Sequence, residues 1–384
     1  MAGTRLLRRQ PEMSIGRKLL EVNWGLLVLL GAICGCGLAM LYSAAGGSLE
    51  PWAERQAMRF GLFVLVLLTI AMVDVRFWFR MAYPIYFATL ALLTTVEFFG
   101  TIGMGAQRWI DLGFIQLQPS EMMKVAMILA LARYFHGVAP EDIGRVTVLV
   151  PPALMAITPA ALVMVQPDLG TAGMLLLAAL MLFFVAGVRL WMFAVILALA
   201  VAAVPIGWEF LHEYQRQRVE IFLNPEIDQL GAGYHITQSK IALGSGGIWG
   251  KGYMLGTQSS LNFLPEKHTD FIFTMLAEEW GLVGALVLLG LYILLLFYGF
   301  AVALRVRNHF GRLLAMGVTI NLFLYVFINI AMVIGLIPVV GIPLPLISYG
   351  GTVMLSLMVA YGLVMSAYVH RDQRISRRGL SEEA

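Results

Sequence analysis

Four ionisable residues stand next to long apolar stretches of the chain: Glu121, Lys124, Asp168 and Asp270. Placing a charge in apolar surroundings costs free energy, so a charged residue found there is a candidate for a functional role. Carboxylates placed in this way suit proton transfer in catalysis. They equally suit an ion-coupled carrier, and spacing alone leaves both open.

Each of the four residues also has a structural interpretation. Glu121 and Lys124 are three positions apart and share a helix face, so they can form an ion pair. Asp168 follows a proline between two apolar runs and suits a turn. Asp270 precedes an apolar run and suits the N-terminal cap of a helix.

Motifs of soluble enzymes and of metal sites are missing from the sequence. Segment 246–251 resembles a phosphate-binding loop, but Ser245 stands where that motif begins with glycine, and Gly252 stands where it requires serine or threonine. No His-Glu-x-x-His occurs and the six histidines are scattered, so no metal site is predicted. Cys34 and Cys36 point to different faces of a helix and are expected to be small core residues.

Composition indicates the class of protein. Hydrophobic residues make up 60% of the 384 residues and charged residues 13%, about half of the ~25% that is typical of soluble proteins. Together with a mean hydropathy of +0.82, this excludes an ordinary soluble enzyme, a disordered chain and a nucleic-acid-binding protein. We therefore expect an all-α integral membrane protein.

About ten apolar runs are long enough to cross a membrane as helices, at ~20 residues each. They are 22–43, 57–74, 79–99, 119–136, 146–165, 169–187, 190–209, 270–302, 312–337 and 345–369. A single polytopic domain, 22–369, is thus expected between a basic N-terminal segment, 1–21, and a C-terminal tail, 370–384. A long loop, about 210–269, separates spans seven and eight and is expected to be folded, with an interfacial helix near 212–220 and a short helix near 234–243.

The placement of lysine and arginine predicts the orientation of the spans. With the N-terminus inside, seventeen of the 26 basic residues lie on the cytoplasmic side and nine outside. Both termini are therefore expected in the cytoplasm and the long loop outside. Trp109, Glu121, Asp168 and Asp270 then fall at the outer ends of four spans, which predicts a polar cavity open to the outer side. Such a cavity suits an exported or lipid-linked, already activated substrate better than a nucleotide.

Several motifs follow one another along nearly the whole chain. They are GAQRWIDL at 105–112, QPSEMMK at 118–124, QPDLGT at 166–171, FLPEKHTDFIF at 263–273 and NIAMVIGLIPVVGIPLPLISYGGT at 329–352. Together they resemble the motifs of the SEDS family (shape, elongation, division and sporulation proteins). Details at 166–169, 256–259 and 348–351 are more similar to the elongation members of the family than to the division members.

The resemblance implies a peptidoglycan glycosyltransferase that polymerises lipid II into β-1,4 glycan strands during cell elongation and rod-shape maintenance. Asp270 matches the family's essential aspartate and is the expected general base. Trp109 matches a functionally important tryptophan, and Glu121, Lys124 and Asp168 match polar positions of the family's cavity. An α-linked donor and a β-linked product imply one inverting displacement, with undecaprenyl pyrophosphate as the leaving group.

The same resemblance implies the remaining contacts. The pyrophosphate needs cations, and the candidates, in order, are Lys124, Lys240 and Arg108. Three further residues are expected at the substrate: Glu266, His268 and Ser348. A divalent cation, Mg²⁺ or Mn²⁺, is a candidate at the pyrophosphate, and no other cofactor is expected. The expected partners are a class B penicillin-binding protein, which supplies transpeptidation, other elongation-complex proteins, lipid II, nascent glycan and the lipids of the bacterial cytoplasmic (inner) membrane.

Two other functions stay open at this point. A lipid II flippase or ion-coupled carrier would also use intramembrane charges, although the sequence has no evident internal repeat and its polar groups fall at span ends rather than at the midplane. A non-catalytic scaffold of the elongation machinery would tolerate Asp270→Asn.

Overall fold

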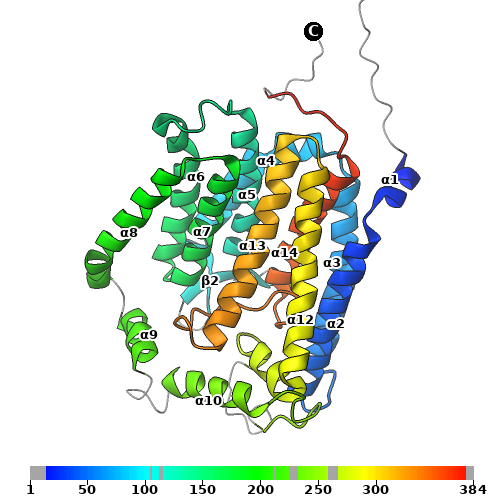
Figure 1. Ribbon diagram of the computed structural model, residues 1–384, viewed down its shortest axis with the longest axis vertical. Coiled ribbons are helices and arrows are strands. Elements are labelled where there is room, and N and C mark those ends of the chain that lie inside the picture. The colour runs from blue at the N-terminus through cyan, green and yellow to red at the C-terminus, as the bar shows by residue number, and fades with distance from the viewer. Residues whose placement is uncertain are drawn as a thin grey trace, which may run out of the picture.

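The computed structural model describes residues 14–103, 106–111, 116–210, 213–224, 232–257 and 267–377. A short helix, α1 (Ile15–Glu21), leads into a bundle of long helices (Figure 1). In these ranges the long helices are α2 (Trp24–Ala44), α3 (Ala53–Met72), α4 (Val75–Phe99), α5 (Pro119–Gly137), α6 (Val146–Val165), α7 (Leu169–Ala186), α8 (Leu190–Phe210), α12 (Ile272–Arg305), α13 (His309–Val333) and α14 (Gly351–Val369).

These helices correspond one by one to the ten predicted spans. Within the described residues, nine of them are long and apolar enough to cross a membrane. The tenth is α5, which has 19 residues and carries three charged side chains, those of Glu121, Lys124 and Arg133. Most of its residues are buried, because other helices surround it. The predicted all-α membrane fold is confirmed.

Three helices, α5, α13 and α14, pack against one another and against α7 and α3 in the centre of the bundle. The most apolar stretches of α13 and α14 are buried over 72% and 83% of their residues, whereas the corresponding stretch of α8 is buried over only 6%. Figure 1 shows α8 leaning away at the edge of the bundle. Since α8 is apolar and exposed along its length, its natural surroundings are lipid tails.

A feature that the sequence did not lead us to expect lies between α4 and α5. Three short antiparallel strands, β1 (Thr101–Gly103), β2 (Ala106–Asp111) and β3 (Gln116–Leu117), pair in the order β1-β2-β3. They place Trp109 opposite Thr101. The strands lie at the end of the bundle where α5 and α7 begin (Figure 1).

The described part of the long loop contains α9 (Glu213–Leu223) and α10 (Ala232–Ser245). The turn after α10 is fastened to α12 by backbone hydrogen bonds, among them Leu282 N to Gly247 O at 2.9 Å and Lys251 N to Glu278 O at 3.0 Å. Gly281 has φ +67° and interrupts the regular geometry of α12 there. A Cβ atom on Gly281 would lie 2.3 Å from the backbone nitrogen of Gly250, so only glycine permits this approach.

The two ends of the described chain lie at the same end of the bundle, where α1 and the segment after α14 meet (Figure 1). The strands, α9, α10 and the start of α12 lie at the other end. This arrangement agrees with an even number of crossings, while the direction of the bundle in a membrane stays a prediction.

Candidate active site

Asp270 closes a turn, 267–270, immediately before α12. The N-cap of α12 is Phe271, and no side chain caps that helix, so the alternative of a capping Asp270 is not observed. The residue is partly exposed, and a Cβ atom on Gly341 would lie 3.4 Å from its Oδ2. Burial lowers the pKa of Lys267 in the same turn. The Asp270 carboxylate thus belongs to a partly exposed residue and lies beside the segment that joins α13 to α14.

The backbone of this turn is held at three consecutive carbonyl groups, those of residues 268–270. Tyr349 N donates to the first at 2.8 Å. Ser348 Oγ donates to the second at 2.6 Å and accepts from Leu344 N at 2.8 Å. Asn329 Nδ2 donates to the third at 3.1 Å and to Ile342 O at 2.7 Å. We call these three hydrogen bonds the carbonyl clamp; it fixes the backbone from which the Asp270 carboxylate projects.

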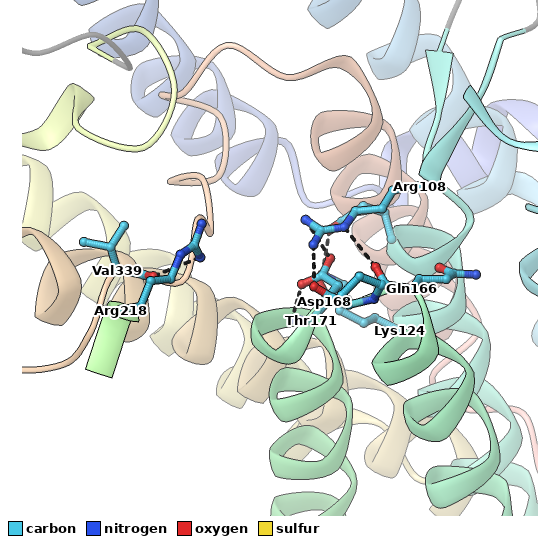
Figure 2. A network of polar contacts seen from close by, with 9 residues as sticks. Arg108, Lys124, Gln166, Asp168, Thr171, Arg218 and Val339 are labelled. Atoms are coloured by element: carbon cyan, nitrogen blue, oxygen red, sulfur yellow. Dashed lines mark hydrogen bonds and ion pairs between the residues drawn. The ribbon is translucent and has the colours of Figure 1, made fainter. Parts of the chain in front are cut away.

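Arg108 of β2 lies over the turn between α6 and α7 (Figure 2). Its guanidinium group donates to Pro167 O at 2.7 Å and to Gln166 O at 3.4 Å, and lies 3.6 Å from Asp168 Oδ2. Asp168 is the N-cap of α7, and its two oxygens accept from the Thr171 amide at 3.0 Å and hydroxyl at 2.9 Å. Both Asp168 oxygens are therefore used within the protein, while the Arg108 side chain is 29% exposed.

The segment that joins α13 to α14 lies between the start of α7, next to the turn that Arg108 contacts, and the Asp270 turn. A Cβ atom on Gly170, at the start of α7, would lie 3.0 Å from Val340 O, and the next residue, Gly341, is the one beside Asp270. Arg218 of α9 donates to Val339 O at 3.1 Å (Figure 2). Three adjacent residues, 339–341, therefore bring Arg218, the start of α7 and the Asp270 carboxylate together.

Glu121 and Lys124 form the ion pair that their spacing predicts, at 2.7 Å. Their side chains are only 4% and 2% exposed. The Tyr325 hydroxyl donates to the other Glu121 oxygen, and Lys124 Nζ lies 4.3 Å from the centre of the Tyr325 ring. Each charge is therefore neutralised by a close partner, as burial requires.

Aromatic rings support the same turn from the side of α3. The His268 and Trp52 rings are parallel, with centroids 4.4 Å apart. The centroid of the Tyr349 ring lies 6.2 Å from that of His268, with the two rings tilted, and Arg59 lies 5.1 Å from the centre of the Tyr349 ring. The imidazole is thus part of a packed face rather than a freely projecting group.

Comparison with known proteins identifies the family. A family model described as "Cell cycle protein", which groups FtsW, RodA and SpoVE, matches residues 17–373. The chain belongs to this family, the SEDS family. It is 46% identical to the peptidoglycan glycosyltransferase MrdB of Escherichia coli K12 over 90% of this chain and 93% of that protein. It is 32% identical to the peptidoglycan glycosyltransferase RodA of Treponema pallidum over 90% and 97%.

Solved SEDS structures share the whole architecture. A chain of a peptidoglycan synthase complex that coordinates polymerization and crosslinking superimposes with a TM-score of 0.79 at 35% identity, covering 92% of this chain and 99% of that one. The rod-shape-determining protein RodA of Thermus thermophilus superimposes with a TM-score of 0.69 at 32% identity, covering 92% and 98%.

The other predicted site residues of this SEDS protein lie around the same end of the bundle. Trp109 is partly exposed on β2. Lys240 is exposed on α10, and its Nζ reaches Gly335, where a Cβ atom would be 2.7 Å away. Ser348 is only 4% exposed and is used in the carbonyl clamp. Glu266 lies outside the described residues.

Three residues at this end of the bundle were not among the residues predicted to act at the site. Asn329 begins the longest motif, and its buried amide could have been suspected from its position inside an apolar helix. Arg218 lies in a polar stretch where no spacing distinguishes it. Glu279, 1% exposed, accepts from Ser43 Oγ at 2.5 Å and from Met254 N at 3.0 Å, which fastens α2 and the loop to α12.

The described residues contain no group of three His, Cys, Asp or Glu that could hold a metal ion by themselves. The donor set near Asp270 therefore fits a cation only where a substrate supplies further oxygens. Asp270 would contribute one carboxylate to such an ion.

Proposed function

We propose that this SEDS protein is a peptidoglycan glycosyltransferase that polymerises lipid II into β-1,4 glycan strands during cell elongation. The observation that carries the proposal is the carboxylate of the partly exposed Asp270, on a backbone held by the carbonyl clamp and beside the segment 339–341 that also contacts Arg218 and the start of α7. The relatives named above as peptidoglycan glycosyltransferases support it, because the alignment with the first of them spans 93% of that protein. Glycosyl transfer needs a positioned base and cations for an anionic leaving group.

Asp270 acts as the base in this proposal. Its carboxylate takes the proton from the 4-hydroxyl group of the acceptor sugar as that oxygen bonds to the anomeric carbon of the donor. The bond between the anomeric carbon and the pyrophosphate oxygen breaks, and its electron pair leaves on undecaprenyl pyrophosphate. Attack opposite the leaving group inverts the α-linked donor to a β-linked product. One carboxylate is enough, since no sugar–enzyme bond forms.

The burial of Lys124 changes the order in which the three basic residues are proposed to bind the pyrophosphate. Arg108 is 29% exposed, and Lys240 is exposed, so either can reach a bound ligand. Lys124 is buried against Glu121 and Tyr325, so its proposed role is structural rather than direct contact with the pyrophosphate. A Mg²⁺ or Mn²⁺ ion shared between Asp270 and the pyrophosphate stays a prediction; when bound, it would neutralise charge on the leaving group. Direct contacts of Trp109, His268, Glu266 and Ser348 with the sugars also stay predictions.

The proposed location is the bacterial cytoplasmic membrane, with both termini inside and the site facing outward. The nine apolar helices found among the described residues and the excess of basic residues on the side of the termini support it. The proposed partner is a class B penicillin-binding protein, because one of the superimposed chains comes from a synthase complex that coordinates polymerization and crosslinking. Such a complex would crosslink the strand as it emerges.

The test is polymerisation of labelled lipid II by the purified protein with its class B partner. Wild type is compared with Asp270→Asn and with Asp142→Asn; the Asp142 side chain, in the loop between α5 and α6, is 39% exposed and pairs with Arg145. We expect polymer from wild type and Asp142→Asn alone, with all three proteins equally folded and bound to the partner. An amount of polymer from Asp270→Asn equal to that from wild type would refute the role of Asp270 as the general base. No polymer from any of them, despite an active partner, would favour the flippase or the scaffold.

A further inference from the structure

A cavity of about 500 Å³ lies at the opposite end of the bundle from the candidate active site. It is bounded by the end of α1, the start of α2 and the ends of α12 and α14. The residues that give it chemical character are Glu21, Trp24, Tyr298, Arg305 and Tyr368. None of them takes part in the proposed glycosyl transfer.

The cavity keeps one positive charge. Glu21 is paired with Arg371 at 2.8 Å, so its carboxylate is neutralised. The exposed Arg305 donates from Nη1 to the Tyr368 hydroxyl at 3.3 Å, and no carboxylate in the described ranges forms an ion pair with it. Within the described residues its guanidinium group has no other hydrogen bond or ion pair. An anion is therefore favoured here, and the ammonium group of a zwitterionic ligand would have no free carboxylate to meet.

Aromatic residues give the cavity the character of a membrane–water interface. Trp24 is 52% exposed, and its Nε1 donates to Leu19 O at 3.2 Å, which holds the indole at the rim. A Cβ atom on Gly25 would lie 2.6 Å from the Tyr298 hydroxyl oxygen, so glycine leaves room for that hydroxyl. Tyrosine and tryptophan are enriched at the membrane–water interface because one end of each ring system is apolar and the other polar.

The surface next to the cavity is apolar and exposed. Val28, one turn beyond Trp24 on α2, is 72% exposed, and Phe297, one turn before Ala301 on α12, is 67% exposed. Leu20, at the rim, is 83% exposed. A molecule with a phosphate at Arg305 could therefore continue as hydrocarbon along α2 and α12. A free phosphate would leave these side chains uncovered.

We propose that this cavity binds the phosphate headgroup of an anionic glycerophospholipid, in the leaflet at the end where both described termini lie. Arg305 pairs with the phosphate, and the Tyr298 hydroxyl donates a hydrogen bond to it. The acyl chains lie along Val28 and Phe297. The proposal does not depend on the proposed glycosyltransferase function, and its test needs no turnover.

The experiment titrates phosphatidylglycerol into the purified full-length protein in phosphatidylcholine-containing micelles and counts bound lipid by native mass spectrometry. Arg305→Gln is expected to weaken phosphatidylglycerol binding about fivefold, the effect of one arginine near an anionic headgroup. Tyr298→Phe is expected to weaken it less. The matched control is Arg307→Gln, which removes an exposed arginine two residues away whose Nε lies 3.3 Å from Asp372 and should bind lipid like wild type.

Three results would overturn the proposal. The first is binding of phosphatidylglycerol no tighter than that of phosphatidylcholine. The second is an equal loss in Arg305→Gln and Arg307→Gln, which would indicate a diffuse attraction to charge. The third is competition by free glycerol phosphate at the same concentration as the lipid, which would indicate a soluble phosphate ligand. Thermal unfolding of each variant checks that the fold is unchanged.

Discussion

Replacing Ser348 by alanine tests whether the carbonyl clamp positions the Asp270 carboxylate. The serine hydroxyl makes two hydrogen bonds, at 2.6 and 2.8 Å, and each contributes about 0.5–1.5 kcal/mol net. Ser348→Ala should therefore lower the free energy of unfolding by about 1–3 kcal/mol. The carbonyl of Thr269, next to Asp270, loses its donor, while the bonds from Tyr349 and Asn329 remain.

The matched control is Ser366→Ala. Ser366 is 0% exposed and also donates to a distant backbone carbonyl, Val73 O, at 2.7 Å, but it lies at the opposite end of α14. One hydrogen bond is lost there, so the free energy of unfolding should fall by about 0.5–1.5 kcal/mol. The polymerisation of lipid II should stay at the wild-type level, because nothing near Asp270 moves.

The assay measures kcat and KM for lipid II polymerisation with the class B partner present. A misplacement of about 1 Å in a reacting group costs up to ~10²-fold in rate, and with two of three clamp bonds intact we expect a loss of about tenfold in kcat and little change in KM. Ser348→Cys, which keeps a weak donor of similar size, should retain more activity than Ser348→Ala. Equal kcat for Ser348→Ala and Ser366→Ala, at equal folded fractions, would refute the positioning role.

Two further predictions use paired variants. Gly341 and Gly46 have φ +73° and +68°, so alanine at either position should lower the free energy of unfolding by about 1–2 kcal/mol. Only Gly341→Ala, whose methyl group would touch Asp270, should also lose polymerisation activity. An equal loss of activity in both variants would contradict this. Lys124→Met leaves the buried Glu121 carboxylate without its cation and should cost about 3–5 kcal/mol, and adding Glu121→Gln should recover most of it. A Lys124→Met variant as stable as wild type would show that the pair is not needed for folding.

The helices were predictable because lipid permits few alternatives to a long apolar helix. All ten spans were predicted as apolar runs; among the described residues nine of the helices are apolar enough to cross a membrane, whereas α5 carries three charged side chains. The short strands were missed, since β1 and β3 have only three and two residues and show no alternating pattern. Their pairing depends on the ends of α4 and α5, which tertiary packing brings together.

Within the site, the spacing of residues in the sequence predicted only those contacts that join residues a few positions apart. The Glu121–Lys124 pair follows from a separation of three in a helix. Arg108 and Asp168 are 60 residues apart, so nothing local could pair them. The structural interpretation of Asp168, as a turn residue, agrees with its place at the N-cap of α7. For Asp270 the corresponding interpretation fails, because Phe271 takes the cap position.

The longest motif, 329–352, works through hydrogen bonds to the backbone of the Asp270 turn more than through exposed side chains. Its first residue, Asn329, and two of its last, Ser348 and Tyr349, all bind the turn 267–270, although about twenty residues separate them. The residues between them form the link that reaches Arg218 at Val339 and the start of α7 at Val340. A motif of small, apolar and proline residues can therefore be required around a single carboxylate without supplying a second reacting group. On this argument, substitutions inside 329–352 should lower activity in proportion to how far they move the backbone at Asp270, and not in proportion to the polarity that they remove.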